Sequence, residues 1–236
     1  MQARRSSLYR KVEEASGPVT YFQDDFSTGT DGNLAGQAAS HIGSWIAAPS
    51  SPSYIEKVSL TYIRSVNATT TINYVEAVPG AGLSFDHDHL RVKSLEQRVL
   101  DNKVQNLLAV SLFSAAGDVR SGVRINFYNP TAATGVRLQV IWYNASRVAQ
   151  VVFSSGDTDI PSFDYYPLEI VAKRLSGNTV ETTVSVNNNI YDGPRQFVVE
   201  PHIFTQNSIL VELRNKDYIA DCIFKDFLVD NQNIHD

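Results

Sequence analysis

The chain has a single cysteine, Cys222, and this scarcity excludes an intramolecular disulfide and a cysteine-based zinc site. We expect Cys222 to be a buried free thiol in an apolar strand. Gly-x-Ser-x-Gly, phosphate-loop and dinucleotide-binding patterns are also missing, and these patterns are typical of serine hydrolases and nucleotide-binding enzymes. No internal repeat is present. The sequence therefore indicates architecture more firmly than chemistry.

Long apolar runs and an excess of positive charge are missing too. No stretch approaches the ~20 apolar residues that cross a bilayer, and no apolar run follows the basic residues near Met1. We therefore expect no secretory signal, no membrane partner and synthesis in a cytoplasm. The net charge of −5 gives no reason to expect nucleic acid. A hydrophobic fraction of 43% with 19% charged residues indicates a folded globular chain.

The dominant hydrophobic period is two, which is typical of β-strands. Segments with this pattern or with β-branched and aromatic enrichment cover residues 21–26, 59–65, 69–75, 104–113, 123–128, 136–143, 168–174, 179–186, 208–214 and 221–229. The alternation predicts that Ile125, Phe127, Leu138 and Val140 are buried. Only residues 94–106 admit a helix, and they lack a strong apolar stripe. This pattern predicts an all-β, antiparallel β-sandwich or jelly roll.

Residues 1–20 differ from the rest because basic side chains cluster there with few apolar neighbours. Such a terminus is often frayed, and the alternative is an arm that becomes ordered against a neighbouring subunit. The side chains assigned to this assembly arm are Arg4, Arg5, Leu8, Tyr9 and Arg10. The loops rich in proline, serine and glycine do not divide the apolar pattern into two halves. We therefore expect an arm (1–20) and one sandwich domain (21–236).

Short motifs at both ends of the domain resemble those of concanavalin A-like (laminin-G-like) sandwich domains. The opening motifs are Asp24-Asp25-Phe26, Asp31-Gly32, Leu34, Gly36 and Gly43-Ser44-Trp45. The strand from Val180 to Asn188 resembles a hairpin of that family, and Phe224–Val229 resembles its closing strand. The resemblance implies that the last strand returns beside the first. With an arginine-bearing arm, the opening is most similar to domains in structural proteins of tailed bacteriophages.

Aromatic side chains are the first candidates for a functional site, because the apolar faces of sugars pack on rings. The candidates for glycan binding are Tyr165, Tyr166, Trp45 and Tyr54. Tyr165 and Tyr166 stand between prolines and are the better candidates for an exposed platform. The alternative for all four is packing in the core or against loops, which is the commoner use of aromatic residues.

Two acidic clusters are candidates for metal binding. Asp157, Asp159 and Asp164 lie in a glycine-containing loop, where oxygen ligands suit calcium, although the spacing is not that of an EF-hand. The run from Asp86 through His87 and Asp88 to His89 has suitable ligands, but a strand would direct alternate residues to opposite faces. The alternative for both clusters is a solvated polar surface, and we expect no cofactor, with calcium as the exception to test.

Catalysis is not expected. Glycosidases need two carboxylates placed across the sugar, and the endo-β-glucanase branch of the resembled family carries Glu-x-Asp-x-x-Glu along one strand. This spacing is absent from the sequence. We therefore predict no hydrolase or lyase activity.

These observations favour a non-enzymatic structural protein of a phage particle, such as a capsid decoration, fibre or tail component. Its expected partners are other virion proteins and copies of itself, and its expected location is the virion. The alternative is a carbohydrate-binding module that recognises cell-surface or environmental glycans. The sequence does not choose among the possible positions in the particle.

Overall fold

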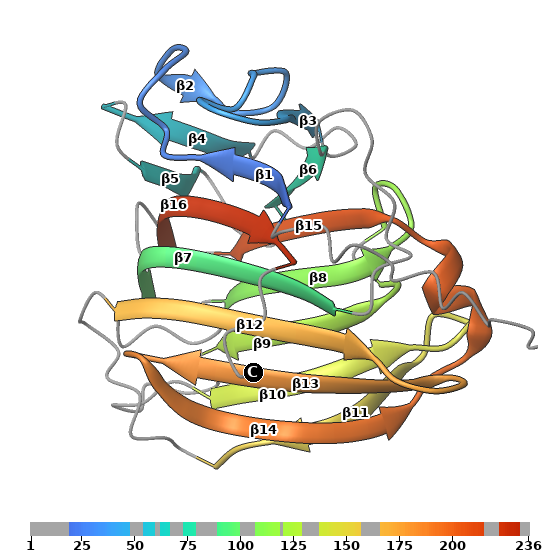
Figure 1. The fold of residues 1–236 in the computed structure, drawn as a ribbon. Coiled ribbons are helices and arrows are strands. Elements are labelled where there is room, and N and C mark those ends of the chain that lie inside the picture. The colour runs from blue at the N-terminus through green and yellow to red at the C-terminus, as the bar shows by residue number, and fades with distance from the viewer. Residues whose placement is uncertain are drawn as a thin grey trace, which may run out of the picture.

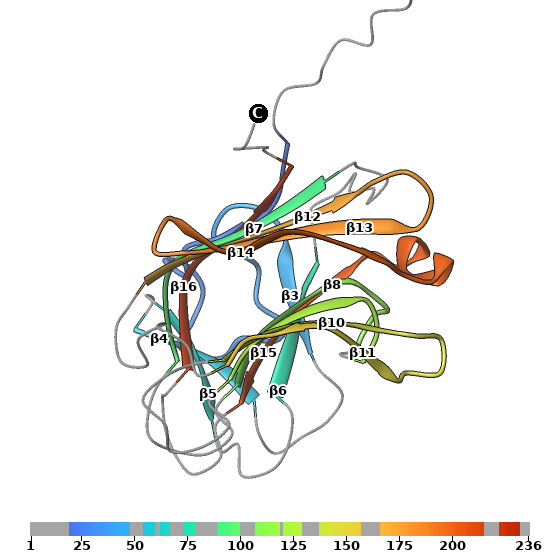
Figure 2. The same ribbon diagram turned by 90° about the horizontal axis from the view of Figure 1, so that it is seen from below.

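The computed structural model is an antiparallel β-sandwich of two sheets (Figures 1 and 2). It describes residues 19–47, 54–59, 62–66, 73–78, 89–99, 107–118, 120–128, 137–156, 166–214 and 222–231. Within these ranges the only helix is the 3-10 turn η1 (Pro201–Thr205). No described helix is long and apolar enough to cross a membrane.

The larger sheet has nine described strands, in the order β14-β13-β12-β7-β16-β5-β4-β2, with β1 also pairing β16. Their bounds are β1 Thr20–Asp24, β2 Gly32–Asn33, β4 Tyr54–Val58, β5 Tyr62–Val66, β7 His89–Val99, β12 Tyr166–Arg174, β13 Thr179–Val186, β14 Asn189–Val198 and β16 Cys222–Asp230. The β13–β14 hairpin turns at Asn187 and Asn188, whose positive φ angles of 53° and 62° suit asparagine in a two-residue loop.

The smaller sheet has seven described strands, in the order β11-β10-β9-β8-β15-β6-β3. Their bounds are β3 Ser44–Ala47, β6 Asn73–Val78, β8 Leu107–Ser114, β9 Val123–Tyr128, β10 Arg137–Tyr143, β11 Ala149–Ser154 and β15 Ser208–Arg214. Figure 2 shows the two layers, with β7, β12, β13 and β14 in one and β8, β10, β11 and β15 in the other.

The first and last strands of the domain are adjacent, as predicted. β1 pairs with β16 in antiparallel register, with Gln23 opposite Leu228 and Asp24 opposite Phe227 (Figure 1). The ring of Phe22 meets the rings of Trp45 and Phe227 edge to face, at centroid distances of 4.7 and 5.8 Å. These aromatic contacts join the two sheets at the corner where the fold closes.

The core lies between the sheets. The predicted inward residues Ile125, Phe127, Leu138 and Val140 are each fully buried, which confirms the chosen face. The sequence left a helix open for residues 94–106, and for residues 94–99 this is wrong. These residues belong to β7, which pairs with both β12 and β16. Pairing on both edges supplies the backbone hydrogen bonds of a segment that has no helical apolar stripe. Residues 100–106 lie outside the described ranges.

Candidate functional site

A hollow of about 450 Å³ lies on the outer face of the seven-stranded sheet, over β9, β10 and β11. Its lining residues are Arg120, Arg124, Asn126, Tyr128, Gln139, Ile141, Tyr143, Ala149, Val151 and Glu212. Strand alternation places them there: where Val123, Ile125 and Phe127 point into the core, Arg124 and Asn126 must point out. The same alternation turns Gln139 and Tyr143 outward from β10.

The floor of the hollow is a chain of polar side chains across three strands. Arg124 Nε donates to Asn126 Oδ1 at 2.6 Å, and Asn126 Nδ2 donates to Gln139 Oε1 at 3.2 Å. The Arg124 guanidinium also forms an ion pair with Glu212 of β15, and both side chains are almost fully buried. Because each group is held by its neighbours, this polar floor is fixed in position before any ligand arrives.

The walls of the hollow combine aromatic and aliphatic groups. Tyr128 and Tyr143 are half-buried, whereas Ala149 and Val151 on β11 are exposed. The amide NH₂ of Gln139 has no hydrogen-bond partner among the described residues, since only its Oε1 is engaged. The hollow therefore offers a free donor and two rings, a combination suited to a ligand with hydroxyl groups and apolar faces.

The loop between β8 and β9 closes one end of the hollow. Ser121 Oγ accepts from the Ala115 amide at 2.8 Å and donates to Asp118 O at 2.7 Å. Gly122 is required there, because its φ is +76° and an added Cβ would lie 2.3 Å from Leu112 O. The Gly117 amide, in turn, donates to the buried carboxylate of Glu76 at 3.0 Å. These contacts fix the backbone that carries Arg120.

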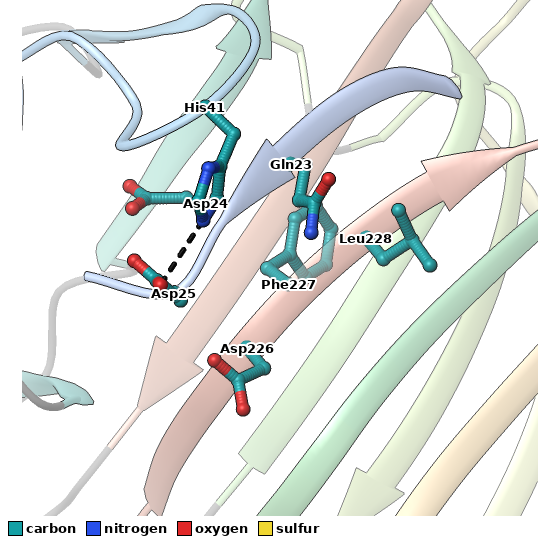
Figure 3. Close-up of a pocket in the computed structure, with 7 residues that line it drawn as sticks. All are labelled: Gln23, Asp24, Asp25, His41, Asp226, Phe227 and Leu228. Atoms are coloured by element: carbon teal, nitrogen blue, oxygen red, sulfur yellow. Dashed lines mark hydrogen bonds and ion pairs between the residues drawn. The ribbon is translucent and has the colours of Figure 1, made fainter. Parts of the chain in front are cut away.

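A second pocket, of about 300 Å³, lies at the closing corner of the sandwich (Figure 3). It is lined by Gln23, Asp24, Asp25, His41, Asp226, Phe227 and Leu228. Asp24 is fully buried and accepts four hydrogen bonds: its Oδ1 takes those of Phe26 N, Ser40 N and Ser40 Oγ, and its Oδ2 that of Trp45 Nε1 at 2.6 Å. Asp24 thus holds the loop that follows β1.

Asp25 in the same pocket is bound to the polypeptide as well. Its carboxylate forms a hydrogen bond with His41 Nε2 at 3.0 Å (Figure 3) and accepts another from the Ser27 amide at 2.9 Å. Hydrogen bonds from Ser27, followed by those of His41 and Ser40, hold the pKa of Asp25 well below its usual range. This carboxylate therefore stays ionised at neutral pH and does not suit a general acid.

Three of the predicted sugar-binding aromatics lie on described strands, β3, β4 and β12, and none of these strands lines the hollow. Trp45 is fully buried between the sheets, which is the core packing given above as the alternative to glycan binding. Tyr54 and Tyr166 begin β4 and β12 of the nine-stranded sheet, the opposite layer, and only their backbone is described. Tyr165 lies outside the described ranges.

The other predicted sites also fall outside the described ranges. These are the arm residues Arg4, Arg5, Leu8, Tyr9 and Arg10, the acidic loop residues Asp157, Asp159 and Asp164, and Asp86, His87 and Asp88. His89 begins β7. Within the part of the chain that the structure describes, no group of three or more His, Cys, Asp or Glu side chains is placed to hold a metal ion.

The residues of the hollow were missed because the sequence reasoning followed the inward face of each strand. The outward residues Arg124, Asn126 and Gln139 stand in the same alternating segments, one position away from predicted core residues. The register that brings Asn126 opposite Gln139 makes them neighbours. Polar residues on the outward faces of two paired strands are the sequence signal that indicates this site.

Comparison with known proteins identifies the fold. No protein-family model matches the chain, and no curated protein matches its sequence. Among solved structures it is similar to the CBM2 module of the evolved Dit of Lactobacillus casei BL23 phage J-1, with a TM-score of 0.58 and 12% identity over 90% of this chain and 95% of that one. It is also similar to the carbohydrate recognition domain of Emp46p, with a TM-score of 0.51 and 9% identity over 74% of this chain and 84% of that one.

A third structure, the receptor binding domain of botulinum neurotoxin D, matches 89% of this chain and 48% of that one, with a TM-score of 0.50 and 8% identity. At these identities the likeness concerns the fold. The chain thus has the β-sandwich fold of these structures, and carbohydrate-binding domains are among them.

Proposed function

We propose that this chain is a carbohydrate-binding domain and that the hollow over β9, β10 and β11 is its glycan site. One observation carries the proposal: a fixed polar floor of Arg124, Asn126 and Gln139 lies between the rings of Tyr128 and Tyr143. Sugars present hydroxyl groups at their edges and C–H groups on their faces, so they need hydrogen-bonding partners and an apolar surface in one place. The sandwich fold, shared with carbohydrate-binding domains, supports the same assignment.

Binding without catalysis is the form of this function that we propose. Glu212 is the only carboxylate among the described residues that line the hollow, and Arg124 holds it in an ion pair. Glycoside hydrolysis requires an acid and a second carboxylate on opposite sides of the scissile bond. Release of reducing ends from a glycan panel, lost on Glu212→Gln, would contradict a purely binding role.

The test is a glycan-binding measurement with two matched glutamine variants. Gln139→Ala removes the free amide donor of the hollow, whereas Gln196→Ala removes an exposed glutamine of β14 that bonds Glu181. We expect Gln139→Ala to weaken binding of the best oligosaccharide about 3- to 10-fold, the value of one hydrogen bond, and Gln196→Ala to leave it unchanged. Equal affinities for the two variants would remove the hollow from the proposal.

We further propose that the domain acts on a phage particle, as a component of the capsid or tail that recognises glycans. The likeness to a module of a phage Dit supports this setting, and so does the basic segment before β1. Deletion of residues 1–17 should leave the domain folded and weaken its association with other copies or with virion proteins. Unchanged assembly after the deletion would contradict the role assigned to the arm.

A further inference from the structure

The charges around the hollow do not cancel. Its described lining holds three side chains that are charged at neutral pH: Arg120, Arg124 and Glu212. Arg124 and Glu212 neutralise each other in their buried ion pair. Arg120 therefore leaves the hollow locally positive, on a chain whose net charge is −5.

Arg120 is exposed at the end of the hollow, and its guanidinium is paired with none of the described side chains. The nearest acid along the chain is Asp118, and both of its oxygens are engaged elsewhere. Asp118 Oδ1 accepts from the backbone amide of Arg120 at 3.0 Å, and its Oδ2 pairs with Arg147 at 3.0 Å. The loop thus fixes the backbone of Arg120 and leaves its side chain available to a ligand.

The position of Arg120 defines which end of a bound saccharide would carry the anionic group. Gly122, two residues further along, accepts from the Tyr143 amide at 3.1 Å, so Arg120 lies at the Tyr143 end of the hollow. From Tyr143 to Gln139 the strand rises about 13 Å, at ~3.3 Å per residue. This length accommodates more than one sugar ring, with one end at Arg120 and the other above Gln139.

We propose that the glycan bound in the hollow is acidic and that Arg120 binds its carboxylate or phosphate group. This inference rests on the proposed function and specifies its ligand. A guanidinium forms two parallel hydrogen bonds with either anion. The uncharged part of the saccharide lies along β10 on Ile141 and Gln139, where the lining carries no uncompensated negative charge.

The test compares tetrasaccharides that differ only in charge. Gluco-, galacto- and manno-tetraoses are each measured by calorimetry in three forms: neutral, with C6 oxidised to carboxylate, and with one 6-phosphate. The proteins are the full chain, Arg120→Gln, Arg120→Lys and Arg174→Gln. Arg174 is the control, because it is an exposed arginine of β12 in the other sheet, lies over the Phe204 ring and does not line the hollow.

We expect at least one acidic form to bind about 10-fold or more tightly than its neutral counterpart. The preference should disappear in Arg120→Gln, persist in part in Arg120→Lys, remain in Arg174→Gln and weaken as salt is raised. The carboxylate and phosphate arms then identify which anion is recognised.

Two results overturn the inference. Equal binding of neutral and acidic forms, or an acidic preference that survives Arg120→Gln, removes the anion site and leaves the carbohydrate-binding function standing. No binding by any tetrasaccharide, to a protein whose circular dichroism shows it folded, contradicts both the inference and the proposed function.

Discussion

The hollow over β9–β11 and the pocket at the β1–β16 corner differ in how their polar groups are used. Among the described lining residues, the corner pocket has three carboxylates, Asp24, Asp25 and Asp226, whereas the hollow has one, Glu212. Yet Asp24 has both oxygens occupied by the polypeptide, and Asp25 is held by Ser27 and His41. In the hollow, Gln139 keeps a free donor. Unused hydrogen-bonding capacity, more than the number of acids, therefore distinguishes the proposed glycan site from the structural joint at the corner.

The largest effect should come from the corner. Asp24→Ala removes the acceptor of three donors: the Trp45 indole N–H and the backbone amides of Phe26 and Ser40. Each buried donor that is left without a hydrogen bond costs about 1–3 kcal/mol. We expect the free energy of unfolding in urea to fall by about 4–5 kcal/mol. Asp25→Ala, which changes a partly exposed carboxylate, should cost much less. A small loss for Asp24→Ala would show that the corner does not depend on this carboxylate.

Loss of the buried Arg124–Glu212 ion pair should lower both the free energy of unfolding and the affinity for glycans. Glu212→Leu removes the carboxylate that pairs with the buried Arg124 guanidinium, which should cost about 3 kcal/mol of unfolding free energy. The double variant Arg124→Met/Glu212→Leu replaces both charges by apolar groups and should recover most of that loss. Glycan binding should be weakened in both variants. Full binding by the double variant would show that the polar floor is not used.

The smallest effect is on the pH dependence of stability, and it comes from Tyr21 in β1. Burial, with a further contribution from the charge of Asp230, raises the pKa of Tyr21 from 10.0 to about 12. The folded state therefore holds this proton more tightly than the unfolded state, so its contribution to stability is complete below pH 10 and is lost as the pH rises towards 12. Tyr21→Phe should flatten this loss in urea titrations between pH 9 and 12. Identical curves for the unchanged protein and Tyr21→Phe would contradict the assignment.

Much of the fold was predictable because period-two alternation records which face of a strand is buried. Phe127 and Val140 follow from this pattern alone, and the pairing of β1 with β16 follows from the family resemblance. The strand at 94–99 was not predictable in this way, because its conformation depends on ladders with β12 and β16 that are distant in sequence.

The candidate site was less predictable than the fold. Trp45 has the residue type of a sugar platform, but its position opposite Phe22 and Phe227 makes it part of the core. Arg124 and Glu212, in contrast, are 88 residues apart and form a pair only because β8 brings β9 and β15 to its two edges. Residue type and local spacing do not encode such a pair, whereas strand register does.

The central claim is that glycans bind in the hollow on the outer face of the seven-stranded sheet. The most direct measurement is a titration of the ¹⁵N-labelled protein with the tightest-binding tetrasaccharide of the panel, followed by amide chemical shifts. The account predicts that the shifts concentrate at Arg124, Asn126, Gln139, Ile141 and Tyr143, with the corner unchanged. Shifts concentrated at Asp25, His41 and Leu228, with β9 and β10 unaffected, would contradict it.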